Sequence, residues 1–235
     1  MIRQILSNPE PINIVITVFS YIVILFICFP VHESAHALTA KLLGDKTAES
    51  QGRISLNPLV HLDPMGTIGL LLFGIGWAKP VPVQPYRARK VSQKSAMAIT
   101  AAAGPISNVL VSLFFMIIAK IIILLSAGDV IVAFGNSLYG VSSTTIGYII
   151  IAIELVISIN LGLGVFNLLP IPPFDGSRIL LAFLPTKLYF KVMEYERFIM
   201  IAVLVLLYTG ILSIPFGILE SLIYSGLDFI TGFIC

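Results

Sequence analysis

Residues 11–38 read PINIVITVFSYIVILFICFPVHESAHAL, and this stretch decides what kind of fold the chain adopts. Residues 11–31 carry no charged side chain, and ~20 apolar residues are enough for a helix to cross the hydrocarbon core of a bilayer. The run is longer than the apolar part of a typical signal peptide, and no small-residue cleavage site separates it from HESAH. We therefore expect a retained transmembrane helix that continues into the two histidines.

The whole chain has the composition of a membrane protein. Of its 235 residues, 57% are hydrophobic and 11% are charged, whereas soluble domains carry about 25% charged residues. No linker, repeat or low-complexity run divides the sequence, so residues 1–235 are expected to form a single domain. Cys28 and Cys235 lie in or beside apolar segments, so no disulfide framework is expected.

The apolar segments predict an all-α polytopic membrane protein with about five transmembrane helices. The first helix is expected over residues 12–43, ending at Gly44 and disturbed by Pro30. The further spans are expected over residues 96–119, 146–169, 198–212 and 215–234, with a C-terminal helical hairpin over about 198–234. Residues 66–77 are apolar but too few to cross, so a small re-entrant or β-hairpin element is expected after the first helix.

Basic residues set the expected orientation. They gather in two connections, after the first and after the third span: Lys79, Arg87, Arg89, Lys90 and Lys94, and Arg178, Lys187, Lys191 and Arg197. Residues 128–145, between the second and third spans, carry no Lys or Arg. By the positive-inside rule the basic connections face the cytosol, and Lys41 marks the cytosolic end of the first helix. We expect a multi-pass protein of the cell membrane; basic residues spread over such loops give no nucleic-acid site.

The motif HESAH places His32 and His36 four residues apart, with Glu33 between them. On a helix the two imidazoles share one face and can hold one metal ion, while Glu33 can accept a proton from water bound to that ion. Ionisable residues inside a membrane are costly and are usually functional. The alternative is a pair of interfacial histidines packed against neighbouring helices, which would leave buried polar groups without partners. We expect one Zn²⁺ per chain at this motif.

A catalytic zinc ion needs a third protein ligand and an open position for water. The candidates are His61, in NPLVH (57–61), and Asp175, in NLLPIPPFDG (167–176). The second stretch breaks the third span with prolines and a glycine, and irregular backbone at membrane depth is tolerated where it lines a wet cavity or is buried in protein. This placement favours Asp175, although the same residue could instead cap the helix that follows.

Four stretches in this order resemble the site-2 protease family of intramembrane zinc metalloproteases: HESAH, GRISLNPLVHLDPMG, AAAGPISN and FNLLPIPPFDG. The resemblance covers about residues 29–184 and is closest to short bacterial members that lack a peptide-binding or nucleotide-sensing domain. It implies His32, His36 and Asp175 as zinc ligands and Glu33 as the catalytic base. It also implies that Asn167 binds the substrate or the oxyanion.

The resemblance implies a zinc endopeptidase whose substrate is a transmembrane segment of another membrane protein, cut near the cytosolic side. Zinc would polarise the scissile carbonyl and activate water, Glu33 would move the proton, and Asn167 or His61 could donate to the oxyanion. A catalytically silent relative that binds membrane helices is the main alternative, but the intact Glu33 disfavours it. A metal transporter is a second alternative, and the external half lacks the continuous polar path that it needs.

Other stretches allow both functional and structural interpretations. Residues 52–56 are predicted to form a short strand, whose edge could take an unwound substrate by strand addition or could belong to a plain hairpin. Residues 77–85, WAKPVPVQP, are expected to be stiff and extended, and an interfacial linker is favoured over a lining of the cytosolic entrance. Gly104 is expected to allow close helix packing. Lys120 and Glu154 are expected to pair near the external ends of their spans.

Overall fold

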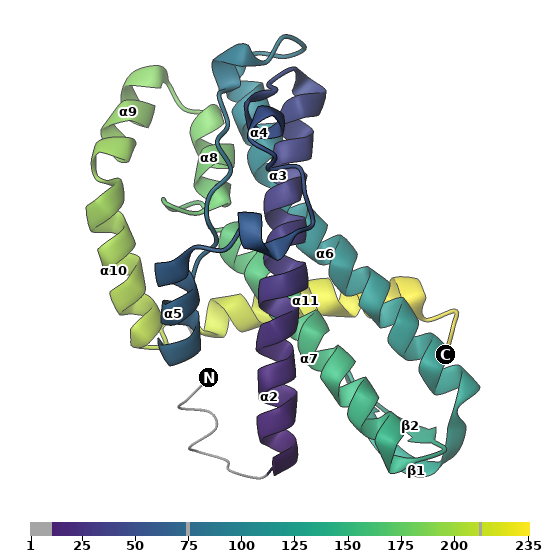
Figure 1. The fold of residues 1–235 in the computed structure, drawn as a ribbon. Coiled ribbons are helices and arrows are strands. Elements are labelled where there is room, and N and C mark those ends of the chain that lie inside the picture. The colour runs from purple at the N-terminus through teal and green to yellow at the C-terminus, as the bar shows by residue number, and fades with distance from the viewer. Residues whose placement is uncertain (1–10, 74–75, 212) are drawn as a thin grey trace.

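In the computed structural model, which describes residues 11–73, 76–211 and 213–235, the chain is mostly helical (Figure 1). The first span consists of three consecutive helical segments, α2 (Pro11–Val23), η1 (Ile24–Cys28) and α3 (Phe29–Leu43). Gly44 ends α3 with a φ of 111°, a left-handed conformation that glycine adopts without steric cost. The helix predicted over residues 12–43 is confirmed, including its end at Gly44.

Pro30 explains the wide turns that precede it. Proline has no N–H and cannot bond to the carbonyl four residues earlier. Segment η1 is π-helical, and the Phe29 N–H donates to the Ile24 carbonyl, five residues back. The expected disturbance therefore takes the form of a short π-helical segment, after which the helix continues through His32 and His36.

Two long helices, α6 (Gln93–Leu125) and α7 (Thr144–Asn167), pack against each other, and α6 also packs against α3. The hydroxyls of Ser92 and Ser143 cap them by accepting the Ser95 and Ile146 N–H groups. In the described part of the chain, four helices are long and apolar enough to cross a membrane: Ile14–Leu43, Gln93–Leu125, Thr144–Asn167 and Ile214–Thr231. The predicted all-α polytopic fold is confirmed.

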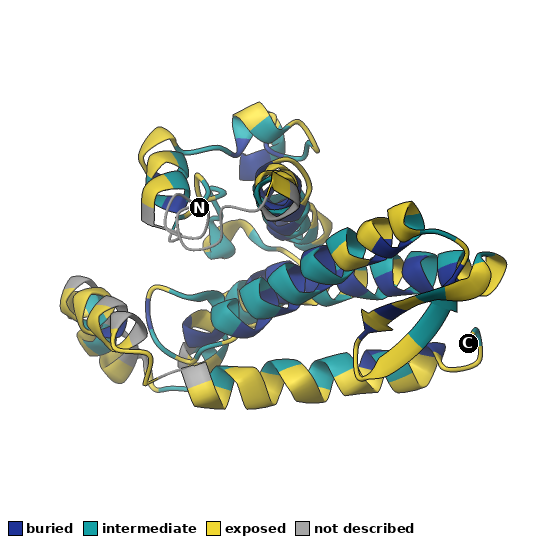
Figure 2. Cartoon of the chain, turned by 90° about the horizontal axis from the view of Figure 1, so that it is seen from below, coloured by how far each residue is buried: buried dark blue, intermediate teal, exposed yellow. Residues whose placement is uncertain are grey.

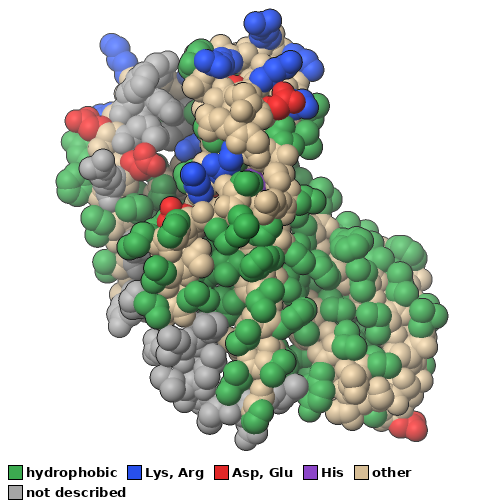
Figure 3. Space-filling model, in the orientation of Figure 1, with side chains coloured by type: hydrophobic (Ala, Val, Ile, Leu, Met, Phe, Trp, Pro, Cys, Tyr) green, Lys and Arg blue, Asp and Glu red, His purple; other side chains and the backbone are tan. Residues whose placement is uncertain are grey.

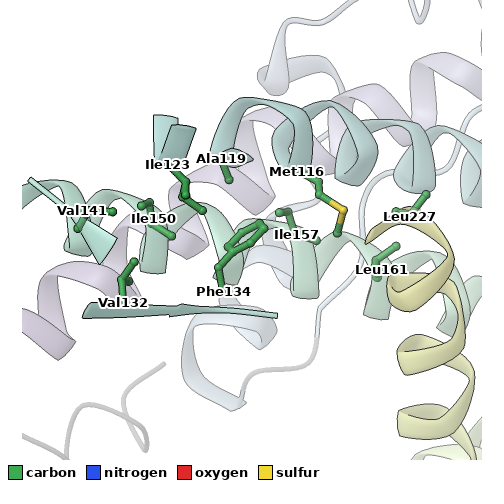
Figure 4. Close-up of a cluster of buried hydrophobic side chains, with 10 residues drawn as sticks. All are labelled: Met116, Ala119, Ile123, Val132, Phe134, Val141, Ile150, Ile157, Leu161 and Leu227. Atoms are coloured by element: carbon green, nitrogen blue, oxygen red, sulfur yellow. The ribbon is translucent and has the colours of Figure 1, made fainter. Parts of the chain in front are cut away.

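A two-stranded antiparallel sheet, β1 (Ala127–Phe134) and β2 (Ser137–Val141), connects α6 to α7. Its apolar side chains join the core between the two helices, as Figure 4 shows. That cluster contains Val132, Phe134 and Val141 from the strands, Met116, Ala119 and Ile123 from α6, Ile150, Ile157 and Leu161 from α7, and Leu227 from α11. The small β element thus lies in the connection that carries no Lys or Arg.

The strand predicted over residues 52–56 is wrong. After the short helix α4 (Thr47–Ser50) the chain forms turns, without a strand, up to the 3₁₀ turn η2 (Pro58–Val60). The reason is that side chains bond to the backbone there. The Ser55 carbonyl accepts a hydrogen bond from the Ser34 hydroxyl and another from His61 Nε2, which lies 2.7 Å away. A carbonyl bonded in this way is not free to join a ladder.

The segment 61–79 forms a long loop whose first and last residues lie next to each other. Helix α5 (Pro64–Phe73) begins this excursion, which includes residues 74–75 outside the described part. The two ends meet because Leu62 bridges to Ala78 and the Lys79 N–H donates to the His61 carbonyl at 2.7 Å. The expected re-entrant element after the metal-binding helix is confirmed in this form. A 3₁₀ turn, η3 (Pro85–Arg87), follows before α6.

Four helices complete the chain: α8 (Asp175–Ala182), α9 (Thr186–Glu194), α10 (Glu196–Tyr208) and α11 (Ser213–Thr231). Figures 1 and 2 show α10 and α11 running in different directions, and α11 packs against α6 and α7. The last two helices therefore do not pair as the expected C-terminal hairpin. Residue 212, within that expected hairpin, lies outside the described residues.

Polar contacts explain why α11 packs on α6 and α7. Lys120 Nζ of α6 lies 2.7 Å from Asp228 Oδ1, and the Tyr224 hydroxyl donates to Glu154 Oε2 of α7 at 2.8 Å. Lys120 is almost completely buried, so its ammonium requires a charged partner. The expected pair between Lys120 and Glu154 is wrong, because each of these residues bonds to α11 instead.

Lys and Arg side chains gather at one end of the molecule, at the top of Figure 3, around α4 and the start of α6. Hydrophobic side chains are spread over much of the remaining visible surface. A wide apolar surface with basic groups at one end is the pattern expected of a membrane protein whose basic loops lie on one side.

Candidate metal centre

Three side chains from two distant parts of the sequence meet inside the helical bundle. Nε2 of His32 and Nε2 of His36 lie 3.1 Å apart, and each lies 3.2 Å from Asp175 Oδ2. Metal–ligand bonds of ~2.0–2.1 Å in a tetrahedron place neighbouring donor atoms ~3.3 Å apart. The spacing of these three donors therefore fits one zinc ion with a fourth position left open. Among the described residues, these three form the one cluster with metal-ligand spacing.

Asp175 reaches the histidines because the chain turns sharply at the end of α7. Asp175 is the first residue of α8, which packs against α6. The turn requires glycine at position 176, where a Cβ would lie 2.1 Å from the Leu168 carbonyl oxygen. Asp175 thereby presents an oxygen ligand beside the two imidazole nitrogens.

Helix α6 orients one of the imidazoles. His36 Nδ1 lies 2.7 Å from the Thr100 carbonyl oxygen, and a carbonyl can only accept. Nδ1 must therefore carry the proton, which leaves the lone pair of Nε2 facing His32 and Asp175. Metal-binding histidines usually have such a partner on their second nitrogen. Thr100 could not be predicted from its residue type, because its role depends on a backbone atom.

Gly104, one turn further along α6, explains how this helix approaches so closely. A Cβ at Gly104 would lie 2.6 Å from His32 Nε2 and 2.5 Å from His36 Nε2. The expectation that Gly104 permits close packing is confirmed, and its neighbours are the two imidazoles themselves. Any larger residue would overlap both imidazoles.

The donor atoms open onto a cavity of about 350 Å³. Its lining includes the three clustered residues together with Glu33, Asn167 and Arg178. Asn167 Nδ2 donates to the Leu163 carbonyl at 2.9 Å, which uses one of its two amide hydrogens. Glu33 Oε2 accepts the Val81 N–H at 3.1 Å. The structure thus brings Glu33 and Asn167 to the same cavity as the histidines.

The proline-rich stretch at residues 77–85 also lies at this cavity. Four of its residues, Pro80, Val81, Val83 and Pro85, belong to the lining. The linker interpretation favoured from the sequence is therefore wrong. Only the folded chain reveals this position, since the stretch is far in sequence from both groups of donor atoms.

His61 lies outside the cluster and is not among the described residues that line the cavity. It is fully buried, its Nε2 donates to the Ser55 carbonyl, and the Ser34 hydroxyl lies 3.4 Å from the same nitrogen. Burial lowers the pKa of His61, so the imidazole is neutral at physiological pH. Of the two residues considered as third ligand, the structure brings Asp175 to the histidines, while His61 supports the loop that follows α4.

Comparison with known proteins agrees with this geometry. Residues 20–207 match the sequence model of "Peptidase family M50". The chain is 37% identical over 199 residues to "Putative zinc metalloprotease YwhC" of Bacillus subtilis, with 83% of each chain covered. It is 29% identical over 150 residues to "Putative zinc metalloprotease Rip2" of Mycolicibacterium smegmatis, covering 62% of this chain and 49% of that protein. No solved structure matches the chain. With four apolar helices of membrane-spanning length among its described residues and a family match over most of its length, this multi-pass membrane protein belongs to peptidase family M50, the site-2 protease family of metalloproteases.

Proposed function

We propose that this protein is an active zinc endopeptidase of the cell membrane that cuts transmembrane segments of other membrane proteins near the cytosolic side. The proposed site consists of one Zn²⁺ held by His32, His36 and Asp175, with Glu33 as the base. The observation that carries the proposal is the convergence of three donor atoms at 3.1–3.2 Å in a cavity that Glu33 also lines. We further propose that the chain acts as a single domain.

Each side chain of the site has a distinct task in this proposal. Bound Zn²⁺ supplies a Lewis acid that polarises the scissile carbonyl and activates water. The carboxylate of Glu33 accepts the proton of the attacking water and delivers it to the nitrogen of the leaving amine. Asn167 lines the cavity and has one amide hydrogen beyond the one bonded to Leu163. We propose that this hydrogen donates to the carbonyl oxygen as negative charge develops there.

The position of the cavity supports cleavage in the cytosolic half of the substrate. The basic residue Arg178 lines the cavity itself, and the basic end of the molecule lies beside the C-terminal end of α3 (Figure 3). Basic loops remain in the cytosol during membrane insertion. Water and the scissile bond would therefore meet the site from the cytosolic side.

The test is the Glu33→Gln variant, which keeps the size and hydrogen-bonding shape of the side chain but removes the base. We expect zinc content to equal that of the wild type, because Glu33 is not one of the three donors. Turnover should fall by ~10²–10⁴-fold, the usual contribution of a general base. Comparing the membrane proteomes of cells with the wild type and with Glu33→Gln would identify the substrates that accumulate.

Glu49→Gln provides the matched control. Glu49 lies on α4 and pairs with Lys41 at 2.7 Å on the surface, away from the cavity lining. This control should cut as fast as the wild type. A zinc-loaded Glu33→Gln protein with unchanged turnover would overturn the mechanism, and a zinc-loaded wild type that cuts no membrane substrate would favour the silent scaffold.

A further inference from the structure

Residues 79–84, KPVPVQ, which we call the proline strap, run along the cavity and touch the proposed base. Pro80 and Pro82 have no N–H, so only Val81 and Val83 can donate backbone hydrogen bonds within residues 80–83. The Val81 N–H donates to Glu33 Oε2 at 3.1 Å. In the described part of the chain, Oε1 of the same carboxylate accepts no hydrogen bond. One oxygen of Glu33 is thus held by backbone and the other is available to the cavity.

The strap is fixed on one side by two buried residues at Lys79. Its N–H donates to the His61 carbonyl at 2.7 Å, and its carbonyl accepts from the guanidinium of Arg53. His61 is fully buried and Arg53 is 6% exposed. The N–H and the carbonyl of Lys79, two residues before Val81, are therefore both hydrogen-bonded.

A second anchor holds the other side of the strap. The Gln84 N–H donates to Asp45 Oδ2 at 2.6 Å, and Asp45 also accepts from the Thr47 N–H at 3.0 Å. Asp45 is 1% exposed and directly follows Gly44 at the end of α3. Hence the strap is tied to the C-terminal end of the same helix that carries Glu33.

We infer that the proline strap is a positioning element for Glu33, in which the Val81 N–H fixes the carboxylate so that its second oxygen faces the reacting water. This inference rests on the proposed role of Glu33 as the base. A glutamate side chain has several rotatable bonds, and ordering it during the reaction would cost entropy. The Val81 N–H lies in a strap that is anchored on both sides, so it orders the Glu33 carboxylate before the reaction begins. Val81 does not contact the substrate in this role; it acts through Glu33.

Proline substitution at position 81 tests the contact directly, because it removes the N–H while the neighbours are already prolines. We expect Val81→Pro to lower kcat by about 10- to 100-fold, the range for losing one hydrogen bond to a charged group. KM and zinc content should stay at the wild-type values, because neither substrate binding nor the three donor atoms are touched. A general loss of structure would instead reduce zinc content and raise KM.

Two control variants isolate the N–H group. Val81→Ala keeps the donor and removes most of the side chain, and Val83→Pro removes an N–H that does not bond to Glu33. Both residues line the cavity, but both variants keep the hydrogen bond to Glu33, so each should cut at least about fivefold faster than Val81→Pro. If Val81→Pro cuts as fast as Val83→Pro, or Val81→Ala is as slow as Val81→Pro, the inference is overturned.

Hydrogen exchange tests the same contact without relying on enzyme activity. Residue-resolved hydrogen exchange compares zinc-loaded wild type with zinc-loaded Glu33→Ala. The Val81 amide should exchange faster in the variant, and the Gln84 amide, bonded to Asp45, should not change. Equal Val81 exchange in the two proteins would overturn the inference. A wild type without turnover would overturn the proposed function itself, whereas an active wild type with a fully active Val81→Pro overturns the positioning role alone.

Discussion

Gly104 lies directly against the imidazole of His36, where a Cβ on the glycine would lie 2.5 Å from His36 Nε2. Helix α6 therefore packs tightly against α3 at the residues that we propose as metal ligands. One turn earlier, the Thr100 carbonyl binds the other nitrogen of the same ring. The shape of the site thus depends on α6, although α6 contributes none of the three donor side chains.

Gly104→Ala should strongly reduce zinc affinity, because the added methyl group overlaps the Nε2 atoms of both histidines. The substitution itself favours the helix by about 1 kcal/mol, so a lower affinity would come from the overlap and not from helix propensity. Chelator competition measures the affinity, and we expect a loss of at least about tenfold, as when support of a metal ligand is disturbed.

Gly147→Ala is the control for this change. Gly147 lies in α7, where a Cβ would meet nothing within 4 Å. This variant should bind zinc like the wild type and unfold at the same or a slightly higher temperature. Wild-type zinc affinity in Gly104→Ala would show that the close approach of α6 is not needed for the metal site.

Asp175→Ala should remove most bound zinc, whereas His61→Ala should leave most of it. Asp175 Oδ2 lies 3.2 Å from both histidine nitrogens, but His61 bonds to Ser55 outside the cluster. Asp175→Ala should lower zinc affinity by more than ~10–100-fold, which is the effect of changing a residue that only supports a metal ligand. Metal analysis of purified proteins gives the answer, and the opposite ranking of the two variants would mean that the third ligand is wrongly chosen.

The stability contribution of His61 should decrease toward acidic pH. Burial lowers its pKa in the folded protein, so the folded state prefers the neutral ring. A depressed pKa gives stability that is fully present above the unfolded pKa of about 6.5 and is lost as the pH falls through the folded pKa. The difference in melting temperature between wild type and His61→Gln should therefore be larger at about pH 8 than at about pH 5, which lies below the unfolded pKa, where this stabilisation decreases.

Asp45→Asn serves as the reference in the same experiment. Burial raises the pKa of Asp45, but hydrogen bonds from Thr47 and Gln84 outweigh it and lower the pKa overall. Its contribution is present above the unfolded pKa of about 4 and is lost only as the pH falls below that value. The difference between wild type and Asp45→Asn should stay constant from about pH 5 to 8. A parallel change in both variants would assign the pH effect to the whole protein and not to His61.

Substrate helices should be cut in their cytosolic half, at segments that unwind easily. Carbonyls in an intact helix are bonded internally, so the scissile segment must first open, and Gly, Pro or Asn near the cut lowers that cost. Mapping product termini made by the purified enzyme in liposomes locates the cuts. Cuts at the external end, or equal rates after these residues are replaced by Leu, would contradict the orientation or the unwinding step.

Features that depend on nearby residues could be predicted from the sequence. The helix through HESAH places His32 and His36 on one face whatever the rest of the chain does, because residues four apart are neighbours on a helix. The apolar runs of the first, second and third spans are long enough to cross a bilayer. In contrast, the strand predicted over residues 52–56 fails because the Ser55 carbonyl binds side chains, and the C-terminal hairpin fails because α11 packs on α6 and α7.

The sequence by itself determined the chemistry: two histidines, a glutamate between them, and an aspartate on a proline-broken segment within an apolar chain. Only the tertiary structure decided which groups support that chemistry. Gly104, Thr100 and the proline strap act through backbone atoms or through the absence of a side chain, so the sequence does not show which groups they touch. They arise because helices and loops far apart in the chain pack to within hydrogen-bonding distance, and that distance is set by the fold as a whole.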